Sequence, residues 1–83
     1  MRTEFLAGTA CAAARLEAEV AWRRNQNMMG AWAREKTPEN LAAHVEARAE
    51  SELANERYKA AKSELDAARA EYLAEMLAKR GAP

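Results

Sequence analysis

The stretch "KTPENLAAHV", residues 36–45, predicts a helix boundary from three independent features. Thr37 is a favoured N-cap residue, because its side-chain oxygen can accept a hydrogen bond from a free amide of the first helical turn. Pro38 suits the first helical position, where its missing N–H costs nothing, and Glu39 suits the positive end of the helix dipole. We therefore expect a helix to begin at residue 38.

This helix is expected to be long, because no glycine or proline interrupts the chain between Pro38 and Gly81. Lys79 and Arg80 supply a cationic last turn before the glycine, so the helix is predicted over about residues 38–80, a length of roughly 65 Å. It carries two apolar rows roughly 165° apart, which one partner helix cannot cover together. The first row is Leu41, Val45, Ala49 and Leu53, and the second is Tyr58, Ala61, Leu65, Ala68, Tyr72 and Met76.

An earlier helix is predicted over about residues 3–24. Apolar residues recur there at steps of three and four, which indicates one buried helix face. These residues are Leu6, Ala10, Ala13, Leu16 and Val20. The polar run "RRNQN", residues 23–27, offers no core residue, and Trp22, Met29 and Trp32 lie on a different azimuth. Residues 25–36 are therefore expected to form a corner and a short helix.

The composition supports one all-α domain over residues 1–83, with 22 alanines and 31% charged residues. We expect an antiparallel helical hairpin with a long C-terminal helix, assembled into an oligomeric helical bundle or coiled coil. Association is expected because a short chain without disulfides or metals buries little surface alone. The interface between copies is predicted at four residues of the second apolar row, namely Tyr58, Leu65, Tyr72 and Met76.

The overall charge balance argues against some partner classes. Thirteen basic and thirteen acidic residues leave no net positive field to attract nucleic acid or an anionic membrane. No run of about 20 apolar residues is available to span a membrane. The opening stretch also departs from a lipoprotein signal, because Gly8 stands three positions before Cys11, where a leucine is expected. A single cysteine favours a reducing, cytoplasmic setting.

Residues that carry chemistry are scarce. His44 is the only histidine, and Leu41 stands three positions before it, so the Glu-x-x-His pair of di-iron bundles is missing. No phosphate-binding glycine loop, Cys-x-x-Cys pair or nucleophile with a neighbouring base is present. We therefore expect no catalytic, metal-binding or cofactor-binding residue and no enzymatic activity.

Two functions remain open. The favoured one is a helical protein–protein interaction module that associates with itself and acts as a small adaptor, scaffold or inhibitor, as many small proteins of bacteria and their phages do. The alternative is a binder of a phosphate-bearing ligand or nucleic acid through the basic corner around residues 23–40, where free amides at a helix start can attract an anion. The candidate partner or anion contacts are Arg23, Arg24, Trp32, Arg34 and Lys36.

Overall fold

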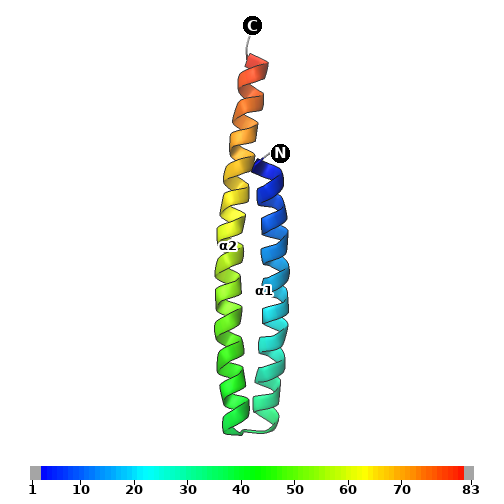
Figure 1. Cartoon of the computed structure of the whole chain (residues 1–83), viewed down its shortest axis with the longest axis vertical. Helices are drawn as coiled ribbons and strands as arrows, with labels where there is room; N and C mark the ends of the chain where they lie inside the picture. The colour runs from blue at the N-terminus through cyan, green and yellow to red at the C-terminus, as the bar shows by residue number, and fades with distance from the viewer. Residues whose placement is uncertain (1–2, 82–83) are drawn as a thin grey trace.

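The computed structural model describes residues 3–81 and contains two helices, α1 (Thr3–Arg34) and α2 (Pro38–Gly81). The helices run antiparallel, side by side, and a short turn joins them at one end (Figure 1). The hairpin measures 71 × 16 × 13 Å, and its radius of gyration is 19.5 Å. A compact chain of this length would have a radius of gyration of about 12 Å. The predictions of an all-α hairpin and of a long C-terminal helix are therefore confirmed.

The turn is closed by Thr37 and Asn40. The backbone N–H of Asn40 donates to Thr37 Oγ1 at 3.1 Å, and the N–H of Leu41 donates to the Thr37 carbonyl at 3.0 Å. The Asn40 side-chain amide donates in the other direction, to the carbonyl oxygens of Glu35 at 2.7 Å and Ala31 at 3.4 Å. Asn40 thus donates its backbone N–H to the N-cap of α2 and its side-chain N–H groups to carbonyls at the end of α1. Those carbonyls have no partner within the helix itself. The predicted N-cap at Thr37 is confirmed.

The first helix continues well beyond its expected end. It runs without a break through residues 25–34 to Arg34, so the predicted end near residue 24 and the separate short helix within residues 25–36 are corrected. The run "RRNQN" contains no helix breaker, and Asn25 lies half-buried against α2. Met28 and Trp32, also half-buried, continue the same contact toward the turn. The polarity of residues 23–27 had suggested a corner, but the structure accommodates these residues within a packed helix.

The two helices meet along a narrow contact, here called the seam, whose residues repeat every seven positions. Each of these residues is buried or half-buried. A strict repeat of seven is typical of helices that supercoil around each other. In α1 the repeat comprises Glu4, Cys11, Ala18, Asn25 and Trp32, with Ala7, Ala14, Ala21 and Met28. In α2 it comprises Asn40, Ala47, Ala54, Ala61 and Ala68, with His44, Ser51, Tyr58, Leu65 and Tyr72.

Alanine is the commonest residue of the seam, and the position of the seam corrects the predicted face of α1. The row of Leu6, Ala10, Ala13, Leu16 and Val20, expected to be buried, is exposed along its length. The helices pack instead through smaller residues, which allow two backbones to approach closely. Cys11 is buried in this contact as a small packed side chain.

The two predicted rows of α2 have different environments. Tyr58, Leu65 and Tyr72, expected at an interface between copies, lie between the two helices of one chain. Leu65 is buried there, and a Cβ placed on Gly8 of α1 would lie 3.9 Å from Leu65 Cδ1. The row that begins with Leu41 and Val45 is exposed. The structure therefore leaves the first row, and not most of the second, available to another molecule.

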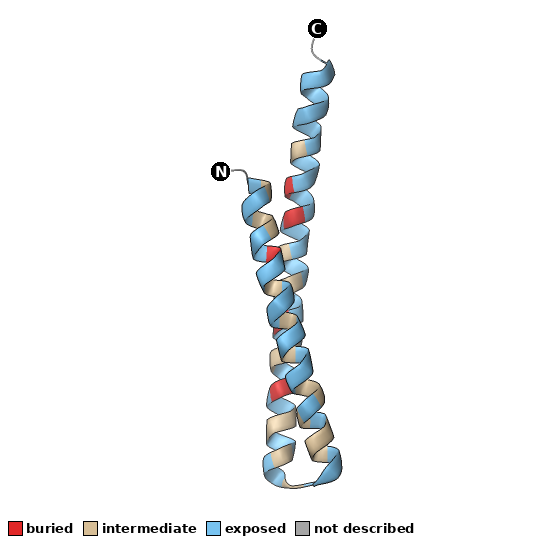
Figure 2. Cartoon of the chain, turned by 90° about the vertical axis from the view of Figure 1, so that its right-hand side faces the viewer, coloured by how far each residue is buried: buried red, intermediate tan, exposed pale blue. Residues whose placement is uncertain are grey.

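The end of α2 extends beyond α1. Residues 73–81, here called the overhang, project past the start of α1 as one helix of about 13 Å (Figures 1 and 2). Every residue of the overhang is exposed, including Met76, the fourth residue predicted at an interface between copies. Neither helix contains a segment that is long and apolar enough to cross a membrane, as far as residues 3–81 show.

Candidate functional site

Large apolar side chains are exposed on both sides of the seam. On one side, Val20 lines a hollow with Arg24 and Glu50. About four turns closer to the free end, Leu6 lines another hollow with Ala67. We call this side the alanine face. Its residues are Leu6, Ala10, Ala13 and Val20 of α1 and Leu53, Ala60 and Ala67 of α2, all exposed.

The opposite side carries an apolar group near the turn, the loop-end patch, formed by Trp22, Met29, Leu41 and Val45. Trp22 lines a shallow hollow of about 390 Å³ together with Asn55 and Tyr58 of α2. Its neighbours in the hollow include Arg15 and Glu19, so the indole lies beside charged side chains. Sequence periodicity had separated Trp22 from the Leu16 and Val20 row, and the structure places it on the other side of the hairpin.

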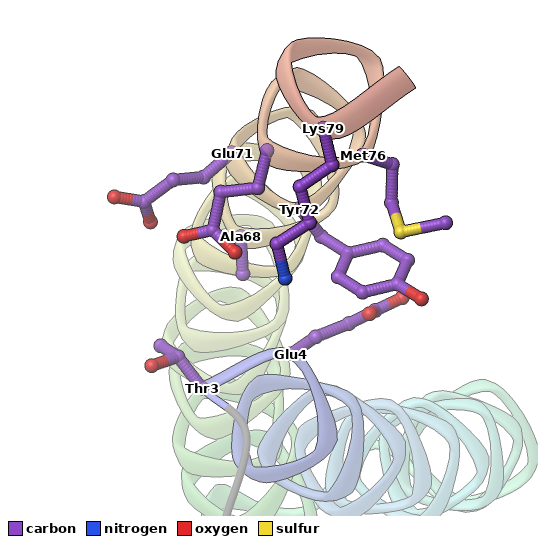
Figure 3. A pocket seen from close by; sticks show the side chains of 8 residues that line it. Thr3, Glu4, Ala68, Glu71, Tyr72, Met76 and Lys79 are labelled. Atoms are coloured by element: carbon purple, nitrogen blue, oxygen red, sulfur yellow. The ribbon is translucent and has the colours of Figure 1, made fainter. Parts of the chain in front are cut away.

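A third hollow, of about 350 Å³, lies where α1 begins and α2 continues alone (Figure 3). Tyr72 and Met76 of α2 and Glu4 of α1 contribute to its lining, and the Tyr72 ring extends toward the first turn of α1. Glu71 and Lys79 add opposite charges to the same opening. The hollow therefore marks the point at which the seam loses its second helix.

The basic residues near the turn do not converge on one point. Arg24 forms an ion pair with Glu50 of α2, which ties the two helices together beside the seam. Arg23 and Arg34 are exposed and eleven positions apart on α1, a separation of about 16 Å along the helix. This distance exceeds the screening length of about 10 Å at moderate salt. Lys36 is exposed in the turn, and Trp32 is half-buried in the seam.

The start of α2 has little capacity left for an anion. Pro38 has no N–H, and the N–H of Asn40 already donates to Thr37 Oγ1. The N–H of Leu41 is also used, by the Thr37 carbonyl, and the side chain of Glu39 adds a negative charge to the first turn. Of the free amides expected to attract a phosphate at this helix start, only that of Glu39 is available.

One seam residue was not singled out from the sequence. The Oδ1 atom of Asn25 is buried, and it has no hydrogen-bond partner among the residues that the structure describes. An unpaired buried oxygen costs about 1–3 kcal/mol. The sequence predicts Asn25 in a corner because the residue is polar. The structure shows that α1 continues through this position and that Asn25 faces α2.

The remaining reactive side chains, those of His44 and Cys11, lie in the contact between the two helices. His44 is half-buried in the seam, and Cys11 is a buried free thiol. Between Thr3 and Gly81, no three His, Cys, Asp or Glu side chains lie close enough together to hold a metal ion. Comparisons with protein-family models, curated proteins and solved structures find no match for this chain.

Proposed function

We propose that this chain is a non-enzymatic protein–protein interaction module, which associates with itself and acts as an adaptor, scaffold or inhibitor toward a protein partner. The observation that supports the proposal is the contrast between core and surface. Only five residues are buried among those described, and four of them are alanine or cysteine. Twelve large apolar side chains are 40–66% exposed.

The position of these side chains makes association the natural way to cover them. A two-helix hairpin has one internal contact, and here alanine and a few larger residues fill it. The exposed leucines, valines and aromatic residues lie on both outer sides and on the overhang. Covering apolar surface contributes about 25 cal/mol per Å², so a second helical surface would stabilise the hairpin as well as bind it. The single free cysteine suits the cytoplasmic setting that we propose for this activity.

Sedimentation velocity across about a hundredfold range of protein concentration tests this proposal. We expect species heavier than the 9.2 kDa monomer, and a melting temperature that rises with concentration because association stabilises the folded chain. Added salt should leave this association intact, since apolar contacts do not weaken under charge screening. A 9.2 kDa species at every concentration, with a constant melting temperature, would reject self-association.

A further inference from the structure

The overhang continues the α2 side of the seam past the start of α1. The residues of α2 that face α1 recur every seven positions as far as Ala68 and Tyr72, and the next positions in the repeat are Glu75 and Lys79. Both line the hollow of about 350 Å³ at the start of α1, so they lie on the side of α2 that α1 covers elsewhere. The overhang is therefore a stretch of seam that lacks a second helix in the single chain (Figure 1).

The two seam positions of the overhang carry opposite charges. Glu75 and Lys79 are both exposed, and neither forms an ion pair with another residue between Thr3 and Gly81. The Lys79 amine extends into the hollow, toward the first turn of α1 (Figure 3). A helix that presents the same two charges in reverse order would be complementary to this pair. The overhang of a second copy, running in the opposite direction, has that order.

A two-fold axis near residue 77, perpendicular to the helices, produces this match. Rotation about the axis sets Glu75 of each copy opposite Lys79 of the other, so the same ion pair occurs twice, as a closed symmetric dimer requires. The rotation also brings the Met76 side chains of the two copies together beside the axis, and Met76 lines the hollow. Exposed ion pairs contribute little to affinity, but they favour one register over others.

No like charges face each other where the two overhangs overlap. The charged residues of the overhang are Glu75, Lys79 and Arg80, and Arg80 lies opposite an alanine of the other copy. The two copies of Glu71 stay about 18 Å apart along the helices, because Glu71 lies outside the overlap. That distance exceeds the screening length of about 10 Å at moderate salt. The tip of each overhang, with Lys79 and Arg80, instead approaches Glu4 and Glu71, which line the hollow of the other copy.

The contact is reciprocal but small, because each copy supplies only the overhang and the start of α1. It belongs with the weak specific interfaces, which cover less than about 1,200 Å² in total. Leu73 and Leu77 do not line the hollow and remain exposed in this arrangement, as do the alanine face and the loop-end patch. The dimer therefore leaves these apolar surfaces available to a different protein.

We propose that two copies of this chain dock end to end, with each overhang packed antiparallel against the other about a two-fold axis near Leu77. Glu75 of each copy pairs with Lys79 of the other, and the two Met76 side chains cover each other beside the axis. The product is a rod about 130 Å long, with a turn and a loop-end patch at each end. This inference rests on the proposed self-association and adds its surface and register.

Small-angle X-ray scattering tests the shape of the dimer. Two hairpins, each 71 Å long, overlap by only about 13 Å in the end-to-end arrangement. We therefore expect the maximum dimension of the particle to increase roughly 1.8-fold between dilute and concentrated protein. Hairpins that associate side by side would form a thicker particle of nearly unchanged length. A dimer no longer than the monomer would overturn this inference and leave self-association standing.

A pair of variants at adjacent positions tests the surface. Met76 and Leu77 are neighbours in the overhang, and of the two only Met76 lines the hollow. Met76→Glu and Leu77→Glu add the same charge, and glutamate has a high helix propensity at both positions. We expect Met76→Glu to raise the dimer dissociation constant at least about tenfold, because the new carboxylates of the two copies meet beside the axis. Leu77→Glu, the matched control, should leave it within about threefold of wild type. Equal effects, or the reverse ranking, would overturn the proposed surface.

Charge reversal tests the register. Glu75→Lys and Lys79→Glu each set like charges opposite each other in the dimer, so each variant alone should have a dissociation constant at least about threefold above that of wild type. An equimolar mixture of the two variants restores opposite charges across the axis and should dimerise about as well as wild type. A mixture that dimerises no better than either variant alone would contradict the proposed pairing.

Sedimentation of the wild type separates failure of this inference from failure of the proposed function. A wild-type chain that is monomeric at every concentration would reject both. A wild-type chain that associates, but whose association is insensitive to Met76→Glu, would reject only the end-to-end dimer.

Discussion

Asn25 is the seam residue whose chemistry fits its surroundings least. Its Oδ1 atom is buried without a hydrogen-bond partner in the described chain, in a seam whose commonest residue is alanine. We predict that Asn25→Ala raises the free energy of unfolding by about 1 kcal/mol or more, because an unsatisfied oxygen is removed and alanine has the higher helix propensity. Chemical denaturation followed by circular dichroism measures the change.

The control for this prediction is Asn27→Ala, two residues along the same helix at an exposed position. It gains the same helix propensity, about half a kcal/mol, without relieving a buried oxygen. Equal stabilisation at both positions would show that the Asn25 oxygen costs nothing in the folded chain. A buried asparagine can also restrict helix register, so loss of a single well-defined state in Asn25→Ala would reveal that second role.

Thr37 acts at the same scale through a single hydrogen bond. Thr37→Ala should lower the free energy of unfolding by about 1 kcal/mol, because the Asn40 amide loses the oxygen that lies 3.1 Å away. Thr9→Ala is the matched control: the Thr9 hydroxyl donates to the Phe5 carbonyl within α1, whose helical hydrogen bonding does not depend on it. A melt of Thr9→Ala should show no loss, and an equal loss in both variants would contradict the capping role.

At the scale of the helices, the environments of two leucines on α2 separate the seam from the overhang. Leu65 is 9% exposed against Gly8 of α1, whereas Leu73 is 60% exposed in the overhang. Leu65→Ala should cost about 2–5 kcal/mol if the site cannot collapse around the lost atoms. Leu73→Ala should cost under about 0.5 kcal/mol, as surface substitutions usually do. Thermal melts at one protein concentration compare them, and a large loss at Leu73 would show that the overhang is covered.

At the scale of the whole molecule, two hypotheses about the binding surface, the basic corner and the apolar faces, predict different effects of the same substitution. Neutralising Arg23, Arg24 and Arg34 together to glutamine should leave the helical content and the self-association unchanged. The Arg24–Glu50 pair is exposed enough that its loss should cost at most about 1 kcal/mol. Sedimentation of the triple variant beside wild type checks this. Loss of association in the arginine variant, reproduced by added salt on wild type, would instead support an anion-binding corner.

Local chemistry allowed a good part of the fold to be derived from the sequence. The start of α2 follows from Thr37, Pro38 and Glu39, since a cap, a proline at the first position and an acidic first turn act within a few residues. The unbroken course of α2 follows from the absence of glycine and proline between residues 38 and 81. The sparse core was likewise foreseeable from a short chain in which alanine is the commonest residue.

The tertiary structure decided which faces meet. Alanine occurs on every face of both helices, so the periodicity of the large residues marked Leu6, Leu16 and Val20 as buried when they are exposed. The seam depends on close approach between helices, a property of two surfaces together that neither helix shows alone. The continuation of α1 to Arg34 could not be predicted for the same reason. Asn25 and Trp32 are half-buried only because α2 lies beside them. The end of a helix depends on a few residues that are neighbours in the sequence. The face that a helix buries depends on the surface of the helix packed against it.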